Sequence, residues 1–144
     1  MGNRRKAREA ALQFLFQDDF GTDGVNLKPL PDRFEIFCEL FQVNHKARPY
    51  ALELLQETKK LQERIDELIG KSATHWRLHR IAATDRNLIR LAVCEMLAEN
   101  DIPDQVAINE AVEIAKRFGS SDSPSFVNGV LDAIKVVLRN EDLA

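Results

Sequence analysis

The stretch "NLIRLAVCEML", residues 87–97, decides the fold class of this chain. Its apolar residues spread over a broad face of a helical wheel, whereas a helix at the surface carries a narrower apolar stripe. Thr84 and Asp85 come just before it and offer an N-cap and an acidic residue in the first turn. Such a helix needs neighbours that cover it on several sides. We therefore predict a central helix within an all-α domain.

Helical periodicity recurs on both sides of this stretch, and no segment shows the alternation of a β-strand. Pro49 is suited to begin a helix, and Gly70 and Gly119 are suited to end one. The predicted helices cover residues 4–18, 32–41, 49–70, 84–97, 105–118 and 123–138, and a short helix is expected within 71–83. The sequence thus predicts an all-α fold, a compact bundle of about six or seven helices. Residues 1–144 are expected to form a single domain, and a division into two sub-bundles near Gly70 stays open.

The composition favours a soluble globular protein. The formal net charge is −3 and hydrophobic residues make up 44% of the chain, which argues against a surface that binds nucleic acid everywhere. No apolar run approaches the roughly 18 residues that span a bilayer, and the N-terminus lacks a signal-peptide core. Cys38 and Cys94 lie singly within apolar segments, which is typical of buried thiols in a reducing compartment. We expect a cytoplasmic protein without membrane contact.

The first eight residues form a local basic patch. All 23 acidic residues of the chain follow them, while four basic residues crowd the start of the first predicted helix: Arg4, Arg5, Lys6 and Arg8. Cations at a helix N-terminus oppose the helix dipole, so an external counter-charge is expected there. Helical spacing places Arg5, Arg8, Leu12 and Phe16 in one stripe, which predicts a basic and aromatic outer surface. Two interpretations stay open: a surface for single-stranded nucleic acid, or a solvated helix end with Phe16 buried.

A second candidate surface lies in "RFGSSDSPSFVNG", residues 117–129, where one helix ends and another begins. In a functional interpretation its aromatic and polar residues bind nucleic acid, helped by free N–H groups at the start of the last helix. In a structural interpretation the aromatic rings belong to the core. Phe118 lies on the apolar stripe of its helix, which favours burial, whereas Phe126 lies at the edge of its stripe. The residues concerned are Phe118, Asp122, Phe126 and Asn128.

The sequence offers no chemistry typical of an enzyme or a metal site. His75 and His79 have a spacing that suits a metal on one helical face, but no cysteine cluster or HExxH pattern supports them. GxSxG, P-loop and GxGxxG motifs are absent. We predict no catalytic residues, no metal and no cofactor.

Three segments together resemble the NusB family of bacterial transcription antitermination factors: "RRKAREAALQFLFQ", "TDRNLIRLAVCEML" and "IPDQVAINEAVEIAKRFGSSDSPSFVNGVLD". The resemblance implies a single helical RNA-binding domain that binds the boxA element of nascent RNA together with NusE, a ribosomal small-subunit protein. In the family this complex joins RNA polymerase and other Nus factors and supports processive transcription of ribosomal RNA operons. The implied activity is binding, not catalysis.

The resemblance also assigns roles to individual residues. It implies partner contact with NusE for Phe16 and Asp85. For RNA binding it implies the basic start of the chain and the corner near the C-terminus: Arg4, Arg5, Lys6, Arg8, Phe118, Asp122, Phe126 and Asn128.

Three alternatives stay open at this point. The chain is a protein-interaction domain whose acidic surface binds a basic ribosomal protein without touching RNA, or it is the NusB-like RNA-binding domain of a ribosomal RNA methyltransferase. The second alternative requires a catalytic domain for which residues 1–144 leave no room, so we expect the form without one. A homodimer through surfaces that overlap the RNA site is the third alternative.

Overall fold

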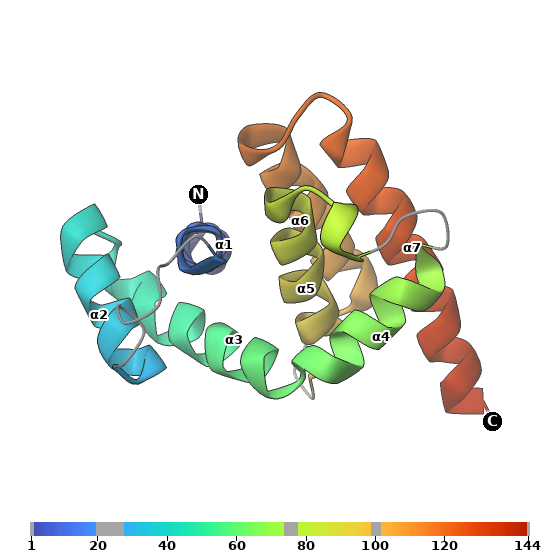
Figure 1. Cartoon of the computed structure of the whole chain (residues 1–144), viewed down its shortest axis with the longest axis horizontal. Coiled ribbons are helices and arrows are strands. Elements are labelled where there is room, and N and C mark those ends of the chain that lie inside the picture. The colour runs from blue at the N-terminus through green and yellow to red at the C-terminus, as the bar shows by residue number, and fades with distance from the viewer. Residues whose placement is uncertain (1, 20–27, 74–77, 99–101, 144) are drawn as a thin grey trace.

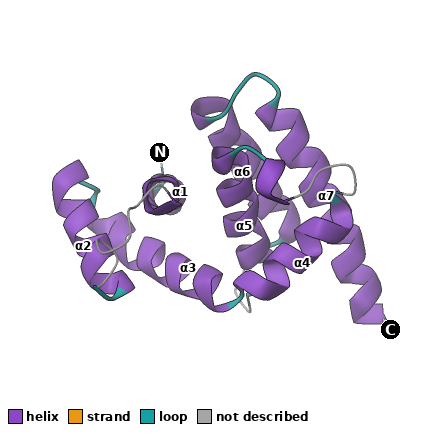
Figure 2. Ribbon diagram, in the orientation of Figure 1, coloured by secondary structure: helices purple, strands orange, loops and turns teal. Residues whose placement is uncertain are grey.

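A computed structural model describes residues 2–19, 28–73, 78–98 and 102–143 of the chain. The described residues form α-helices joined by short connections and contain no strand, as Figure 2 shows. The predicted all-α class is confirmed. The helices are α1 (Asn3–Asp19), α2 (Leu30–Phe41), α3 (Arg48–Lys60), α4 (Gln62–Ser72), α5 (Ala83–Leu97), α6 (Asp104–Phe118) and α7 (Ser123–Leu143), with 3-10 turns η2 (His45–Ala47) and η3 (Leu78–Arg80).

Helix α5 is the centre of the fold, as its broad apolar face predicts. Leu88, Ile89 and Leu91 are at most 2% exposed, and the helix packs against α1, α3, α4, α6 and α7. Figure 1 shows α5 between α1 on one side and α6 and α7 on the other. The predicted N-cap at Thr84 is wrong, because α5 begins one residue earlier and its N-cap, Ala82, makes no side-chain hydrogen bond.

The long helix predicted over residues 49–70 is wrong, since two helices replace it. The chain bends at Leu61, where φ is −97° and ψ is 8°. Helix α3 packs against α1 and α2, whereas α4 continues in a new direction and packs against α7 (Figure 1). Gly70, the predicted end, lies within α4. The apolar stripe continues through the bend, and neither proline nor glycine marks it, so periodicity alone indicates one helix.

Helix α1 joins the two sides of the molecule. In Figure 1 it is seen end-on, with α2 on one side, α5 on the other and α3 passing below it. Its Phe14 ring meets Phe34 and Phe37 of α2 edge-to-face, at 5.5 and 5.6 Å between ring centroids. Buried residues from both sides belong to one continuous hydrophobic cluster.

Both cysteines are free and buried, as predicted. Burial raises the pKa of Cys94 to about 11 and also raises that of Cys38, so both remain thiols at neutral pH.

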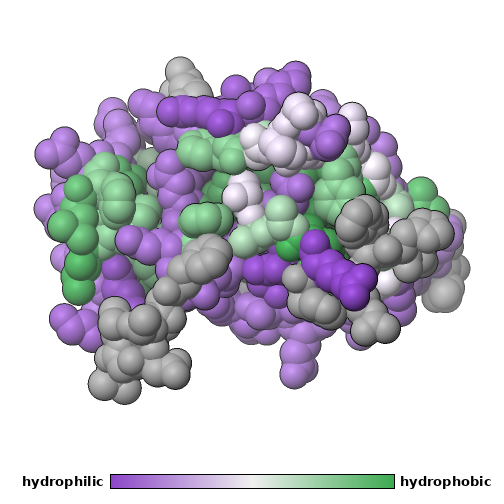
Figure 3. Space-filling model, turned by 45° about the horizontal axis from the view of Figure 1, so that its top comes forward, coloured by the Kyte–Doolittle hydropathy of each residue, from purple (hydrophilic) through white to green (hydrophobic). Residues whose placement is uncertain are grey.

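The surface of α2 carries an apolar patch. Ile36, Leu40 and Phe41 are exposed there, and Figure 3 shows apolar side chains gathered at that edge of the molecule. Within the described part of the chain, no helix is long and apolar enough to cross a membrane. Of the short helix expected within 71–83, only the 3-10 turn η3 is seen, and residues 74–77 lie outside the described residues.

Replacing Ile89 by Ala should lower the free energy of unfolding by about 2–5 kcal/mol, because a fully buried side chain in the central helix leaves a cavity. Val136→Ala is the control, since Val136 is 59% exposed and should change stability by less than about 0.5 kcal/mol. Urea unfolding followed by circular dichroism measures both. Equal losses would contradict a core centred on α5.

Candidate nucleic-acid interface

The basic start of α1 divides into exposed and buried side chains. Arg4 is exposed, and its guanidinium carbon lies 5.0 Å from the centroid of the Tyr50 ring on α3. The Arg5 side chain is 34% exposed and Lys6 is half-buried. Arg8 is only 6% exposed. One turn of helix therefore presents some cations to solvent and turns another inward.

Arg8 forms a buried ion pair with Glu95 of α5. Its Nε donates to both carboxylate oxygens of Glu95, at 2.9 and 3.0 Å, and Glu95 is 2% exposed. The Tyr50 hydroxyl donates to the same carboxylate, and Arg8 Nη1 donates to Glu110 Oε1 of α6 at 3.1 Å. Burial and this bond to a carboxylate raise the pKa of Tyr50, burial being the larger cause. The pair ties α1 to the central helix.

The predicted outer stripe of Arg5, Arg8, Leu12 and Phe16 is wrong. Phe16 is 43% exposed, but Leu12 is 2% and Arg8 6% exposed, because this side of α1 packs toward α5. Helical spacing places residues on one face without saying what that face meets. The counter-charge that the basic helix start requires is supplied for Arg8 from within the protein.

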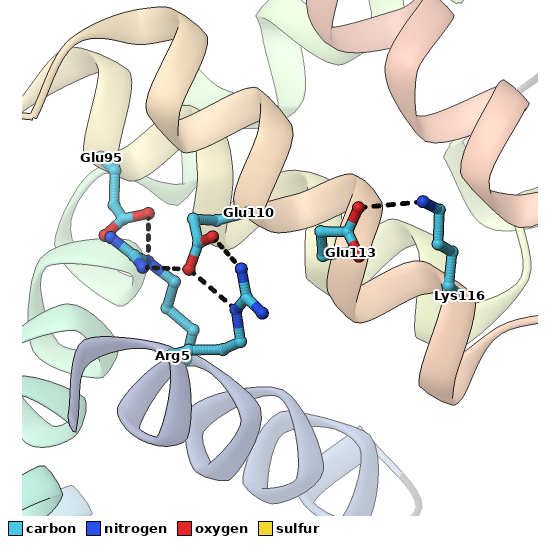
Figure 4. A network of polar contacts seen from close by, with 6 residues as sticks. Arg5, Glu95, Glu110, Glu113 and Lys116 are labelled. Atoms are coloured by element: carbon cyan, nitrogen blue, oxygen red, sulfur yellow. Dashed lines mark hydrogen bonds and ion pairs between the residues drawn. The ribbon is translucent and has the colours of Figure 1, made fainter. Parts of the chain in front are cut away.

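Arg5 is also paired within the protein, but at the surface. Its Nε donates to Glu110 Oε1 at 3.0 Å and its Nη2 donates to Glu110 Oε2. Figure 4 shows Glu110 between the guanidinium of Arg5 and a second guanidinium, that of Arg8, which also binds Glu95. The hydrogen bonds from Arg5 hold the pKa of Glu110 below its ordinary value despite partial burial. Glu110 is therefore ionised at neutral pH.

A third ion pair extends this contact toward the end of α6. Arg117 Nη1 donates to both carboxylate oxygens of Glu9, at 3.0 and 3.2 Å, and the Arg117 guanidinium lies 5.2 Å from the Phe118 ring centroid. We call Arg5, Arg8, Glu9, Glu110 and Arg117 the polar seam between α1 and α6. Arg5 pairs with Glu110 near the middle of α6, and Glu9 pairs with Arg117 near its end, so the seam runs toward the C-terminal end of α6.

The corner between α6 and α7 lies at the far end of this seam. Gly119 ends α6, and a Cβ there would lie 2.4 Å from Ser123 Oγ, so only glycine fits without a shift. The Ser120 N–H donates to the Ser123 hydroxyl at 2.9 Å and closes the turn. Close approach of the two helices at Gly119 thus fixes the start of α7.

The predicted corner residues divide between core and surface. Phe118 and Phe126 are half-buried and pack against the hydrophobic cluster, whereas Asp122 and Asn128 are exposed. The burial expected for Phe118 is therefore partial, as it is for Phe126, and contact of either ring with RNA stays a prediction. The seam places this corner and the basic start of α1 along one side of the molecule.

The two predicted partner-binding residues lie on neighbouring helix ends. Asn87 Nδ2 donates to Asp19 Oδ2 at 2.8 Å and joins the end of α1 to the start of α5. Phe16 is exposed one turn before that end, whereas Asp85 is 8% exposed. Asp85 Oδ1 is buried, and no donor among the residues that the structure describes bonds to it.

Sequence reasoning missed Tyr50, Glu95, Glu110 and Arg117. Glu95 stands alone in the apolar run of the central helix, and a lone acid in such a run indicates a buried cationic partner. Arg117 lies in the last turn of α6, where a basic residue is already explained by the helix dipole. For this reason its sequence position does not indicate the contacts with Glu9 and Phe118.

Among the described residues, no three His, Cys, Asp or Glu side chains cluster in a way that suits a metal ion. His75 lies outside the described residues, as does the side chain of His79.

Comparison with known proteins decides the family. The sequence profile of the NusB family matches residues 5–135. The chain belongs to the NusB family. A NusB transcription antitermination protein from Desulfotalea psychrophila is 56% identical over 140 residues, which cover 96% of this chain and 99% of that protein. The resemblance seen in the three sequence segments is confirmed.

Solved structures of the NusB family share the fold. NusB of T. maritima superposes with a TM-score of 0.78 at 39% identity, covering 91% of this chain and 89% of that one. A chain in a structure of antitermination factors NusB and NusE in complex with dsRNA gives a TM-score of 0.76 at 27% identity, covering 93% of this chain and 96% of that one. The NusB fold is thus found in a complex with both RNA and NusE.

Arg8→Met should lower the free energy of unfolding by about 3–5 kcal/mol, because it leaves the Glu95 carboxylate buried without its cation. Arg4→Met, four residues earlier on an exposed position, should lower it by less than about 1 kcal/mol. Chemical denaturation at neutral pH measures both variants. A mild effect of Arg8→Met would show that the buried pair does not hold α1 in place.

Proposed function

We propose that this protein is a transcription antitermination factor that binds boxA RNA together with NusE. Membership of the NusB family supports this proposal. The observation that carries it is that the polar seam connects the exposed cations at the start of α1 with the aromatic corner between α6 and α7. The protein then supports processive transcription of ribosomal RNA operons, in a complex with RNA polymerase and other Nus factors. It acts in the cytoplasm, as one domain, by binding without catalysis.

The basic start of α1 and the corner make different contributions to RNA binding. Arg4, Arg5 and Lys6 contact phosphates, which provides affinity without sequence preference. Arg8 acts indirectly, because its buried pair with Glu95 holds α1 in position.

At the corner, the half-buried rings of Phe126 and Phe118 stack on unpaired bases. Asp122 and Asn128 are exposed beside them and are suited to accept and donate hydrogen bonds at base edges. Single-stranded RNA fits this arrangement, since a base reaches an aromatic ring only when it is unpaired.

NusE binds at the end of α1 and the start of α5. Phe16 provides exposed aromatic surface there, and Asp85 on α5 has a buried carboxylate oxygen for which no described residue supplies a donor. This site lies on helices that also bear the basic residues, so the partner and the RNA are bound by one rigid unit. The structure of NusB and NusE with dsRNA shows that relatives assemble with both.

The double variant Arg4→Gln/Lys6→Gln should flatten the salt dependence of boxA RNA binding. Two lost phosphate contacts reduce the slope of log affinity against log salt by about 1.4, at about 0.7 per contact with a single strand. Gel-shift titrations at several salt concentrations measure the slope, with Lys46→Gln on the exposed turn η2 as the control. An unchanged slope would remove Arg4 and Lys6 from the interface.

Replacing Phe126 by Ala should weaken boxA RNA binding by about 1–3 kcal/mol if its ring stacks on a base. Phe126 is half-buried, so the melting temperature is measured in parallel. Weaker binding to RNA with retained binding to NusE supports stacking. Loss of both activities together with a large fall in melting temperature would make Phe126 a core residue instead.

A further inference from the structure

We propose that Glu110 is an internal competitor of RNA phosphate for Arg5, and that it limits the affinity of this protein for RNA. The inference rests on the proposed function, because it concerns the same basic start of α1. Glu110 is an acidic residue among the cations of a surface that is proposed to bind RNA. A negative charge at that place lowers the affinity for RNA, so its presence there needs a role.

The geometry of the pair carries the proposal. Arg5 presents Nε and Nη2 side by side, and the two oxygens of Glu110 occupy both donors. Two oxygens of a phosphate bind a guanidinium in the same forked arrangement, so carboxylate and phosphate compete for one set of donors.

Exposure separates this pair from the buried one beside it. The side chains of Arg5 and Glu110 are 34% and 19% exposed, which leaves the pair accessible to a ligand. The side chains of Arg8 and Glu95 are 7% and 2% exposed. An incoming phosphate therefore meets Arg5 and its counter-ion but cannot reach the structural pair.

The charge of the cluster leads to the same conclusion. Arg5, Arg8, Glu95 and Glu110 carry two positive and two negative charges, so the cluster is neutral when all four are ionised. Hydrogen bonding with Arg5 lowers the pKa of Glu110, and hydrogen bonding with Glu110 raises that of Arg5, so both stay charged at neutral pH. A phosphate therefore pairs with Arg5 only when Glu110 gives up its bonds to Arg5.

This exchange has a consequence for the salt dependence. A phosphate that pairs with Arg5 releases its condensed counterion, but the displaced Glu110 keeps only the bond from Arg8, which is shared with Glu95, and attracts a cation from solution. The two effects oppose each other, so Arg5 adds little to the slope while Glu110 is a carboxylate. Without that carboxylate, Arg5 should add about 0.7 to the slope, the value for one phosphate contact with a single strand.

The chain offers a variant that tests Glu110 and a matched control. Glu110→Gln keeps the size and an acceptor oxygen but removes the charge, while Arg8 keeps its pair with Glu95. Glu113→Gln makes the same change of net charge one turn along α6, where Glu113 binds the exposed Lys116 at 2.9 Å and no arginine of α1 (Figure 4). A difference between the two variants reports the arginine contacts of Glu110, not the overall charge, and the share of Arg5 is separated from that of Arg8 by the Arg5→Gln variants described below.

The experiment is a titration of boxA RNA, in the presence of NusE, against the full chain and its variants at several salt concentrations. Glu110→Gln should bind about 1.5-fold to fivefold more tightly than Glu113→Gln at low salt, the range for losing an exposed ion pair, with a slope steeper by about 0.7. Melting temperatures check folding. If Glu110→Gln folds poorly, Glu110→Asp replaces it, since the shorter side chain loses the fork, and it should tighten binding by a smaller factor.

Arg5→Gln in each background completes a double-mutant cycle. It should weaken binding more in the Glu110→Gln protein than in the wild-type protein, because only there is Arg5 free for phosphate. Equal affinities of Glu110→Gln and Glu113→Gln would overturn the proposal, and so would weaker binding by Glu110→Gln, which would make Glu110 a residue that positions Arg5. Failure of the wild-type protein to bind boxA RNA would overturn the proposed function as well.

Discussion

The buried ion pair of Arg8 and Glu95 is the constraint on which the rest of the structure depends. A charge at 6% exposure and another at 2% are tolerated only with good geometry, which the two bonds from Arg8 Nε and the hydroxyl of Tyr50 provide. The pair joins α1, α3 and α5 at one point. Because α1 lies between the two sides of the molecule, its position sets how those sides meet.

The polar seam extends from this ion pair along α1 and α6. Long charged side chains connect the two helices: Arg5 binds Glu110 through two nitrogens, and Arg117 binds both oxygens of Glu9 through Nη1. The seam therefore links the basic helix start to the corner at Gly119 with a defined register. A single RNA strand binds both the basic start of α1 and the corner only when the distance between them is fixed. The ion pairs of the seam hold these two sites in place relative to each other.

The sequence predicted the helices and the central position of α5 because apolar periodicity measures burial, which dominates helix packing. It failed at Leu61, where the chain turns without any residue that disfavours a helix. It also failed to separate Arg8 from Arg5, since both have the same chemistry and only the neighbouring helices decide which is buried. Asp85 shows the same limit: its place in the first turn of α5 was clear, but its burial depends on elements far away in the chain.

Tyr50 is the one tyrosine of the chain, and it stands where α1, α3 and α5 meet. Its phenol is bonded to a carboxylate beneath two guanidinium groups, an environment that exists only while α1 is docked. A chain with isotope-labelled tyrosine thus gives one ring signal in nuclear magnetic resonance, and that signal reports whether α1 is docked at the junction.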